Sequence, residues 1–344
     1  MVDHTPPKLE DVARLAGVST ATVSRCLNAP EKVIDATRKR VLSAVKELGY
    51  MPNFGARALA AKRSHTIGAI IPTMENSIFA RGLQAFQEKL SEHSFDLLVA
   101  SSSYKRELEY KQIRSLVARG AEGLLLIGTE RDDEIYEFLA DRNIPYVLSW
   151  SFQNNKDAPY HDHFVGFDNA SAMSEMTGRV MDLGHKNITM ISGKHDGNDR
   201  AFERALGFKL AFEKRGLDFD ASSIVETPYD FGNAGAACQK MLEQSNPPTA
   251  IICGNDVLAV GAIMRAQELG MNVPQDVSIT GFDDIQIASV ISPALTTVHV
   301  PHRQMGHFAA KTLLDLIQND EPIKSTKLST HIVDRASLSA PKKS

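Results

Sequence analysis

The chain has 344 residues, of which 43% are hydrophobic and 7% aromatic, and its 42 acidic and 38 basic side chains give a net charge of −4. This length predicts two or three domains with hydrophobic cores, and the composition excludes disordered, collagen-like and mucin-like proteins. The three cysteines are widely separated and include no CxxC pair. We therefore expect no disulfide framework and no structural zinc site, and a reducing, cytoplasmic compartment.

Basic side chains are concentrated at the amino-terminal end. Residues 1–65 contain 11 Lys/Arg and 6 Asp/Glu, a net charge of +5, whereas the rest of the chain carries −9. Such a division suggests a polyanion-binding module joined to a body with no need to contact nucleic acid. Charged residues near the start of the sequence argue against a signal peptide for export. The sequence also lacks an apolar run of about 18 residues, so no membrane span is expected.

Three short helices are predicted near the amino-terminus. Apolar side chains recur on one face of residues 9–16, and Gly17 ends the pattern. Ser19 is a suitable N-cap for the second helix, because its hydroxyl can accept a hydrogen bond from an N–H of the first turn. The third helix is predicted to have Asp35 as its N-cap and to end at Gly49. Two helices around a tight turn, closed by a third, form a helix-turn-helix unit.

The outward face of the second helix could enter the major groove of DNA. Thr20, Ala21 and Arg25 would then face base edges, and Arg25 is the side chain able to make a bidentate contact with guanine. The side chains expected to reach phosphates are Ser19, Thr22, Ser24 and Asn28. The alternative is a protein-interaction module, because Ser and Thr on a helix face are often only solvated.

A hinge is predicted in residues 53–65. The segment is too short and too glycine-interrupted to be a stable isolated helix, and it ends in two cations. Leu59 is a candidate wedge for a minor-groove base step, with an ordinary surface leucine as the alternative. The hinge residues expected to contact DNA are Asn53, Arg57, Ala58, Leu59 and Lys62.

These segments contain the runs LEDVARLAGVSTATVSRCLN and TRKRVLSAVKELGYMPNFGARAL. The runs resemble the LacI/GalR family of bacterial transcriptional repressors, and the resemblance continues through nearly the whole chain. It implies that Thr20, Ala21 and Arg25 occupy base-reading positions and that Leu59 opens a central base step of the operator. Lys8 departs from the family, which usually has a capping threonine there. Lysine cannot accept that hydrogen bond, a loss of about 1 kcal/mol.

After Ser64 the sequence alternates buried strands with amphipathic helices in two series, which are separated by the polar loop 153–164. The first series has predicted strands at 67–72, 95–100, 123–127 and 145–150, with helices at 77–93, up to 117 and at 135–139. The second has strands at 188–192, 223–227, 249–253 and 277–282, with helices at 170–183, 200–215, 234–242 and 256–269. This order predicts two α/β lobes with parallel sheets covered by helices.

The resemblance implies a body like the periplasmic sugar-binding proteins, with chain crossings between lobes near Val165, Leu295 and Thr326. The expected domains are a helix-turn-helix head in residues 1–52, the hinge in 53–65, and an effector-binding and dimerisation domain in 66–344. The first lobe is expected at about 66–164 and 296–325, and the second at about 165–295 and 326–339.

Two α/β lobes suit a small-molecule site, because ligands lie beyond the carboxyl ends of parallel strands. The candidates in the first lobe are Thr73, Asn76, Phe79, Ser102, Ser149 and Trp150, and those in the second are Arg204, Asn255, Asp256 and Asp283. Acidic and amide groups suit a polyol, and Trp150 or Phe79 could stack on its apolar face. Core packing is the alternative for both aromatic residues.

The resemblance implies that Arg204, Asn255 and Asp283 match ligand-binding positions of the family. Arg200 beside Arg204 is compatible with a sugar acid, although loop 194–200 could simply be a solvated charged loop. The run VGFDN at residues 165–169 is closest to gluconate-type repressors. By contrast, Ser149 stands where several sugar or purine sensors have an aspartate, so no single effector follows from the resemblance.

No enzyme motif is found, because GxGxxG after a strand, GxxxxGK[ST], GxSxG and HExxH are all missing from the sequence. His161 and His163 flank Asp162, but surface histidines without supporting partners seldom hold a metal. We therefore expect no catalysis, no metal and no cofactor.

The expected function is that of a cytoplasmic repressor that binds a palindromic operator as a homodimer, under the control of a sugar or sugar-acid effector. The dimer is expected because one head contacts only one half-site. No tetramer is expected, because the sequence shows no leucine heptad repeat for a coiled coil. The sign of the effector response does not follow from the sequence. The alternative is a cytoplasmic solute-binding or scaffold protein whose basic head docks a protein partner.

Overall fold

The computed structural model describes residues 6–51, 63–75, 77–153, 163–318 and 324–342. The chain divides into two compact units, Met1–Ser64 and His65–Ser344. Among the described residues, no helix combines the length and apolar character needed to cross a membrane. The predicted hinge falls almost wholly on residues 52–62, outside the described part of the chain.

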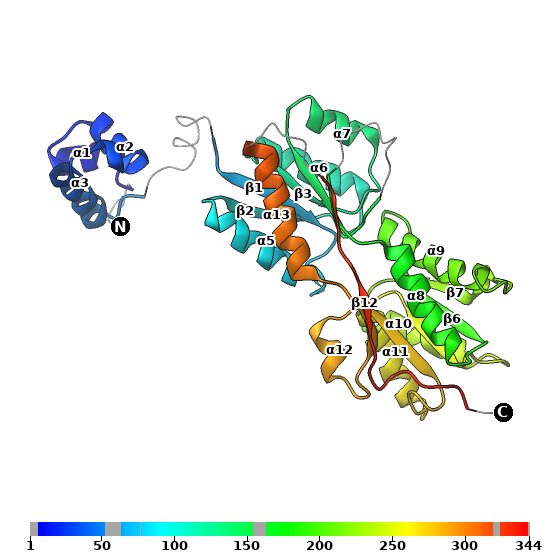
Figure 1. The fold of residues 1–344 in the computed structure, drawn as a ribbon. Coiled ribbons are helices and arrows are strands. Elements are labelled where there is room, and N and C mark those ends of the chain that lie inside the picture. Colours follow the sequence, from blue (N-terminus) through cyan, green and yellow to red (C-terminus); the bar gives the residue numbers. More distant parts are fainter. Residues whose placement is uncertain (1–5, 52–62, 76, 154–162, 319–323, 343–344) are drawn as a thin grey trace. The chain divides into compact units, whose positions relative to one another are not determined.

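Residues 6–51 form three α-helices around a small core (Figure 1). Their bounds are α1 Leu9–Ala16, α2 Thr20–Asn28 and α3 Asp35–Leu48, with a short 3-10 helix at Pro30–Lys32. The buried side chains of the core are Val12, Ala13, Ala16, Val23, Cys26, Val41 and Ala44. This arrangement confirms the predicted all-α helix-turn-helix head.

Local hydrogen bonds explain where α2 and α3 begin. The Ser19 hydroxyl accepts a hydrogen bond from the Thr22 N–H at 3.2 Å, as predicted for an N-cap. The prediction for Asp35 is wrong by one residue: Ile34 is the N-cap, without a side-chain hydrogen bond, and Asp35 is the first helical residue. Its carboxylate lies 2.8 Å from Arg38 and is stabilised by the positive end of the helix dipole.

The first helix retains an N-terminal hydrogen bond although Lys8 stands at its N-cap. The Asp11 carboxylate accepts a hydrogen bond from the Lys8 main-chain N–H at 2.9 Å, which is one half of a capping box. At the other end, Gly17 adopts a left-handed conformation with φ 63°, as is typical of a residue that ends a helix. These local interactions define both ends of α1.

The described part of the body contains two six-stranded sheets. The first has the order β11-β5-β4-β3-β1-β2, with β1 Thr66–Ile71, β2 Asp96–Ser101, β3 Leu124–Ile127, β4 Tyr146–Ser149, β5 Phe164–Gly166 and β11 Thr326–Lys327. The second has the order β12-β10-β9-β8-β6-β7, with β6 Ile188–Gly193, β7 Ile224–Thr227, β8 Ala250–Cys253, β9 Ser278–Asp283, β10 Thr296–His299 and β12 His331–Val333. Only β12 pairs antiparallel among these strands, so the predicted α/β body with parallel sheets is confirmed.

Helices cover both faces of each sheet (Figure 1). Side chains of β1 alternate between two hydrophobic clusters, with Ile67, Ala69 and Ile71 in one and Ile70 in the other. The helices on the first sheet are α5 Ala80–Glu92, α6 Arg106–Ala118, α7 Asp133–Ala140 and α13 His302–Gln318. Those of the second lobe are α8 Asn169–Asp182, α9 Asp199–Glu213, α10 Phe231–Leu242, α11 Asp256–Glu268 and α12 Gln286–Val290.

The chain crosses between the lobes a few residues beyond each predicted point. Val165 lies in β5 and pairs with the first sheet, so the first crossing follows Gly166. Residues 296–299 form β10 and pair with β9, so they belong to the second lobe and not, as predicted, to the first. Residues 326–327 form β11 in the first sheet instead of the second. These strands are too short for periodicity to show which sheet they join.

Candidate functional site

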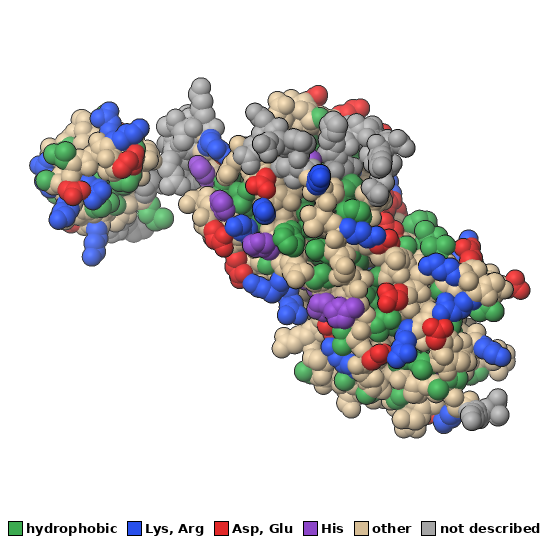
Figure 2. All heavy atoms as spheres, viewed as in Figure 1, with side chains coloured by type: hydrophobic (Ala, Val, Ile, Leu, Met, Phe, Trp, Pro, Cys, Tyr) green, Lys and Arg blue, Asp and Glu red, His purple; other side chains and the backbone are tan. Residues whose placement is uncertain are grey.

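The second helix of the amino-terminal unit presents its polar face to solvent. Thr20, Ala21 and Arg25 are exposed, whereas Val23 and Cys26 on the opposite face are buried in the core. On the face of the molecule shown in Figure 2, Lys and Arg side chains are prominent on this unit, while both signs are interspersed over the body. The predicted reading residues of α2 therefore share one accessible surface.

Several of the predicted phosphate contacts pair with one another. The Ser19 and Thr22 hydroxyls lie 2.9 Å apart, and the Asn28 side chain donates a hydrogen bond to the Ser24 hydroxyl at 3.3 Å. The predicted hinge contacts Asn53, Arg57, Ala58, Leu59 and Lys62 lie outside the described residues, as does the cleft candidate Asn76.

In the body, Arg204 from α9 connects three segments of the second lobe. Its Nε donates to Asn169 Oδ1 at 2.9 Å, its Nη1 donates to the Gly254 carbonyl at 2.6 Å, and its Nη2 lies 3.4 Å from Asp283 Oδ1. The guanidinium also packs on the Phe282 ring, 3.9 Å from the centroid. These contacts fix Arg204 and hold the Asp283 carboxylate at the carboxyl end of β9.

Strained backbone is found at the strand ends that face the lobe boundary. Asp283 has φ 105° and Trp150, directly after β4, has φ 62°. Ser103 and Tyr104, in the loop after β2, have φ 50° and 58°. Non-glycine residues at positive φ cost free energy and are found preferentially at functional sites. Both lobes therefore contribute strained residues to the same region.

Trp150 is fixed by close packing. Its indole lies 5.4 Å from the Phe79 ring in an edge-on arrangement, and a Cβ added to Gly82 would meet it at 2.5 Å. A Cβ added to Gly306 would in turn meet the Gly82 carbonyl at 1.9 Å, so glycine at both positions allows α5 and α13 to pack closely. Phe79 thus supports Trp150 from within the core.

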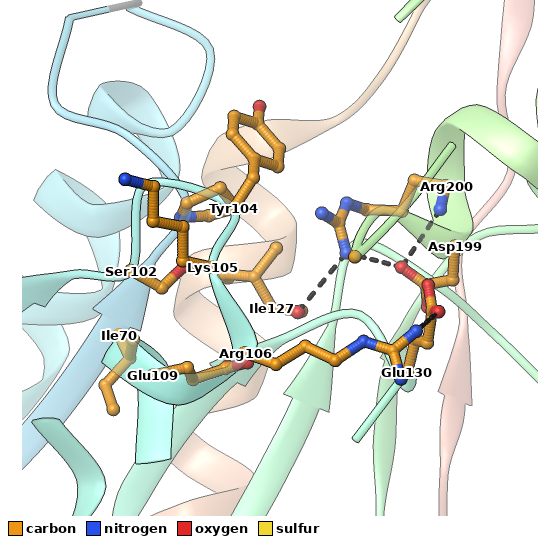
Figure 3. Close-up of a pocket in the computed structure, with 12 residues that line it drawn as sticks. Ile70, Ser102, Tyr104, Lys105, Arg106, Glu109, Ile127, Glu130, Asp199 and Arg200 are labelled. Carbon is orange, nitrogen blue, oxygen red and sulfur yellow. Dashed lines mark hydrogen bonds and ion pairs between the residues drawn. The ribbon is translucent and has the colours of Figure 1, made fainter. Parts of the chain in front are cut away.

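A pocket between the lobes is bridged by the first turn of α9 (Figure 3). Asp199 Oδ2 accepts hydrogen bonds from the Thr129 N–H at 2.5 Å and the Thr129 hydroxyl at 2.8 Å. Arg200 donates to the Ile127 carbonyl at 3.3 Å and to Asp199 at 2.6 Å. Burial alone would raise the pKa of Asp199, but Arg200 and the Thr129 donors outweigh it and hold the pKa below its usual value. Ser102, as predicted, lines this pocket.

A second groove of about 320 Å³ shares Tyr104 with this pocket and is lined in part by Thr73. Two tyrosines from opposite lobes meet there: the rings of Tyr104 and Tyr229 lie 5.9 Å apart with an angle of 33° between them. Burial raises the pKa of both phenols, so both stay neutral. Neither tyrosine is among the sequence candidates, although each follows a predicted strand, which is the signal that could have identified it.

Three predicted cleft residues have structural hydrogen bonds instead. Ser149 donates its hydroxyl hydrogen bond to the Val165 carbonyl at 2.6 Å, which joins β4 to β5. Asn255 Oδ1 accepts from the Leu258 N–H at 2.9 Å and caps α11. Asp256 accepts from Thr297 at 2.5 Å and from the Ile285 N–H at 2.8 Å. Their polar atoms stabilise the strand ends that carry the site.

The described residues contain no group of three or more His, Cys, Asp or Glu side chains placed to hold a metal. His161 and Asp162 of the predicted HDH candidate lie outside these residues.

Comparison with known proteins places the two units in one family. Residues 8–53 match the bacterial regulatory proteins of the lacI family, and residues 177–338 match a periplasmic binding protein-like domain. The chain is 33% identical over 316 residues to catabolite control protein A of Priestia megaterium, covering 92% of this chain and 94% of that protein. The chain belongs to the LacI family. It is also 33% identical to the transcriptional repressor PurR of Salmonella paratyphi B, over 96% of both chains.

Solved structures agree with this assignment. A LacI-family regulator from Silicibacter pomeroyi superimposes with a TM-score of 0.86 at 28% identity, covering 97% of this chain and all of that one. The lac repressor dimer bound to operator and the anti-inducer ONPF gives a TM-score of 0.83 at 25% identity, covering 98% and 100%. This LacI-family protein is therefore a DNA-binding transcriptional repressor with a helix-turn-helix head and a two-lobed body.

Proposed function

We propose that this LacI-family repressor binds a palindromic operator as a homodimer and changes its operator affinity when a small effector binds between its lobes. The observation that carries the DNA-binding part is the exposed face of α2, where Thr20, Ala21 and Arg25 stand together on a helix that is capped and packed from behind. That face has the length and chemistry to read base edges in a major groove. The relative solved as a dimer on its operator supports this arrangement.

The homodimer is supported by apolar side chains exposed on the second lobe. Phe231 of α10, Met264 of α11 and Val290 of α12 are 47%, 48% and 72% exposed, and Leu269 at the end of α11 is 41% exposed. Apolar groups gathered on adjacent helices are typical of a protein interface. Val290→Glu should convert the dimer to a monomer in sedimentation experiments and weaken operator binding, whereas the exposed Ser222→Glu should leave the dimer intact.

The effector part of the proposal is supported by the interlobe contacts. Asp199 and Arg200 of the second lobe bind the main chain of the first, and Ser151 of the first lobe donates to Glu203 of the second at 3.1 Å. A ligand that enters between the lobes must rearrange these contacts, so it binds the two lobe arrangements unequally. A coupling of about 1–3 kcal/mol would change operator affinity roughly 5- to 150-fold.

The hinge is expected to contribute to operator binding as well. In this proposal Leu59 enters a minor-groove base step between Arg57 and Lys62. Leu59→Ala should reduce DNA bending and operator affinity while leaving ligand binding intact. Unchanged bending of the operator fragment would remove the wedge role.

The experiment that tests the function is a binding titration with duplex DNA from the gene's own neighbourhood at several salt concentrations. Phosphate contacts release counterions, so the affinity should fall linearly on a logarithmic scale as salt increases. A protein-docking head would show no binding to any of these duplexes, and that result would refute the proposal.

A further inference from the structure

Two histidines oppose each other on neighbouring strands of the second sheet. His299, the last residue of β10, pairs in antiparallel register with His331, the first residue of β12. Directly opposed residues of an antiparallel pair point to the same face of the sheet. The side chain of His299 is 35% exposed and His331 is exposed, and histidine side chains are visible at the surface beside β12 in Figure 2. The two imidazoles therefore form a pair that ions in solution can reach.

The distance between the two rings suits the ligands of a single metal ion. Their centroids lie 4.8 Å apart, with 37° between the ring planes. A zinc–nitrogen bond is about 2.0–2.1 Å long, so the ring centroid of a bound histidine lies about 3 Å from the ion, and two such centroids at a tetrahedral angle lie about 5 Å apart. One ion could thus contact both rings while β10 and β12 keep their pairing.

Asp284 fixes the ring of His299 in the form that a metal requires. Asp284 Oδ2 lies 2.8 Å from His299 Nδ1, and Asp284 Oδ1 lies 2.6 Å from Arg335 Nη2. The guanidinium keeps the carboxylate charged, and a carboxylate only accepts hydrogen bonds. Nδ1 therefore carries the ring proton, and Nε2 presents a lone pair. Surface histidines seldom hold a metal without such a supporting partner, and His299 has one.

His331 supplies the second nitrogen. Among the described residues its ring contacts that of His299 and takes part in no hydrogen bond. An exposed imidazole without a fixed partner can turn either nitrogen toward an ion. The nearby Arg335 is already matched by Asp284, and the two side chains are 19% and 15% exposed. Arg335 therefore adds no unbalanced positive charge against a bound cation.

The pair lies where the chain crosses between the lobes. The chain leaves the second sheet at His299 and enters α13 of the first lobe at His302. It returns from β11 of the first sheet, which ends at Lys327, to β12, which begins at His331. A metal ion bound to both histidines would join the start of one crossing to the end of the other.

We propose that His299 and His331 bind Zn²⁺ or a similar transition-metal ion, with water at the remaining positions, and that the bound ion restrains the two crossings. Imidazole nitrogen suits Zn²⁺, Ni²⁺ and Cu²⁺, whereas Mg²⁺ and Ca²⁺ take oxygen ligands. Two protein ligands are fewer than a structural zinc site has, so the ion should exchange with the solution. Neither histidine lines the pocket or the groove described above. The inference therefore does not depend on the proposed function.

A zinc titration of the full-length protein against a chromophoric chelator of known affinity tests the proposal. Every protein in the series would carry His161→Gln and His163→Gln, so that the HDH run cannot bind the ion. His331→Gln and His299→Gln should each weaken Zn²⁺ binding at least about tenfold. His307→Gln, which removes an exposed histidine of α13, is the matched control and should leave the affinity unchanged. A protein that binds no Zn²⁺, or an affinity that His331→Gln does not change, would overturn the proposal.

Hydrogen exchange then locates the ion and measures its effect on the crossings. Saturating Zn²⁺ should slow the exchange of main-chain amides in β10, in β12 and in residues 300–302, because an ion held by both strands opposes their local opening. His331→Gln should abolish this protection, and the same concentration of Mg²⁺ should give none. Protection by Mg²⁺, or protection by Zn²⁺ that persists in His331→Gln, would overturn the assignment.

Discussion

The amino-terminal unit and the body present their functional side chains in opposite ways. On α2 the candidate reading residues are exposed, and the helices behind them serve only to hold the surface in place. In the body, Trp150, Arg204 and Asp283 are at most 5% exposed and packed into contacts within the protein. A surface that binds a large partner can thus be exposed to solvent before binding. A site that encloses a small molecule instead consists of contacts within the protein that the molecule must join or replace.

The largest effect is expected in the buried site. Asp283→Ala removes an acceptor and leaves Arg204 without its carboxylate in a water-poor environment. Effector affinity should fall at least about a hundredfold, and the effector should no longer change operator binding. Calorimetric titration with the effector measures the loss. Asp182→Ala is the control, because it removes an exposed carboxylate paired with Arg215 in the same lobe. A fully ligand-responsive Asp283→Ala protein would show that the cleft is misplaced.

The exposed surface should give the next largest effect. Arg25→Ala should weaken operator binding by about 1–3 kcal/mol and random-sequence binding much less, because a bidentate base contact is lost. Fluorescence anisotropy with both duplexes measures the difference. Arg14→Ala on α1 is the control, since that side chain is 79% exposed and pairs only locally with Asp11. An equal loss on both duplexes would mean that Arg25 contacts phosphate alone.

Lowering the pH should affect the buried site of the body, because that site contains a carboxyl group that titrates near neutral pH. Burial raises the pKa of Asp283 to about 6, although Arg204 opposes the shift. Lowering the pH from 7 to 5 protonates the acceptor, so effector affinity should fall roughly tenfold. The pKa of Asp283 is higher in the folded protein than in the unfolded chain, so binding of the proton favours the folded state. This contribution to the free energy of unfolding is present at low pH and is lost as the pH rises through about 6. A dissociation constant that stays flat between pH 5 and 7 would contradict the acceptor role.

The smallest effect is expected from the support of the reading helix. Ser19→Ala removes the hydrogen bond to the Thr22 N–H and should destabilise α2 by about 1 kcal/mol. Hydrogen exchange of the α2 amides in the full-length protein should become faster. Ser43→Ala, at an exposed position of α3, should leave these rates unchanged. Exchange as slow as in the unsubstituted protein would show that packing alone holds α2.

Much of the fold could be predicted from the sequence, because long elements have clear periodicity. The strand expected at 188–192 is β6, Ile188–Gly193, and the helix expected at 256–269 is α11, Asp256–Glu268. By contrast, β5, β11 and β12 have two or three residues each and form by pairing with distant segments. The spacing of Met305, Ala309 and Leu313 is a helical signal that would have identified α13.

The sequence could predict where the residues of the candidate site lie along the chain, but not which groups their side chains contact. Arg204 and Asp283 are both sequence candidates, and the structure brings them together. Ser149 also lies at a strand end, yet its hydroxyl is turned to the neighbouring strand. The sequence shows where a strand ends but not which way its last side chain points.

The three crossings between lobes have a consequence for synthesis on the ribosome. The three α-helices described in the amino-terminal unit are complete once residue 48 has emerged from the ribosome, whereas the first sheet must wait for β11 at residues 326–327 and the second for β12 at 331–333. Neither lobe can finish folding before the other is nearly complete. A message that ends before α13 would therefore produce a folded DNA-binding head on a body that cannot bind the effector. Such a product is suited to interfere with the intact protein.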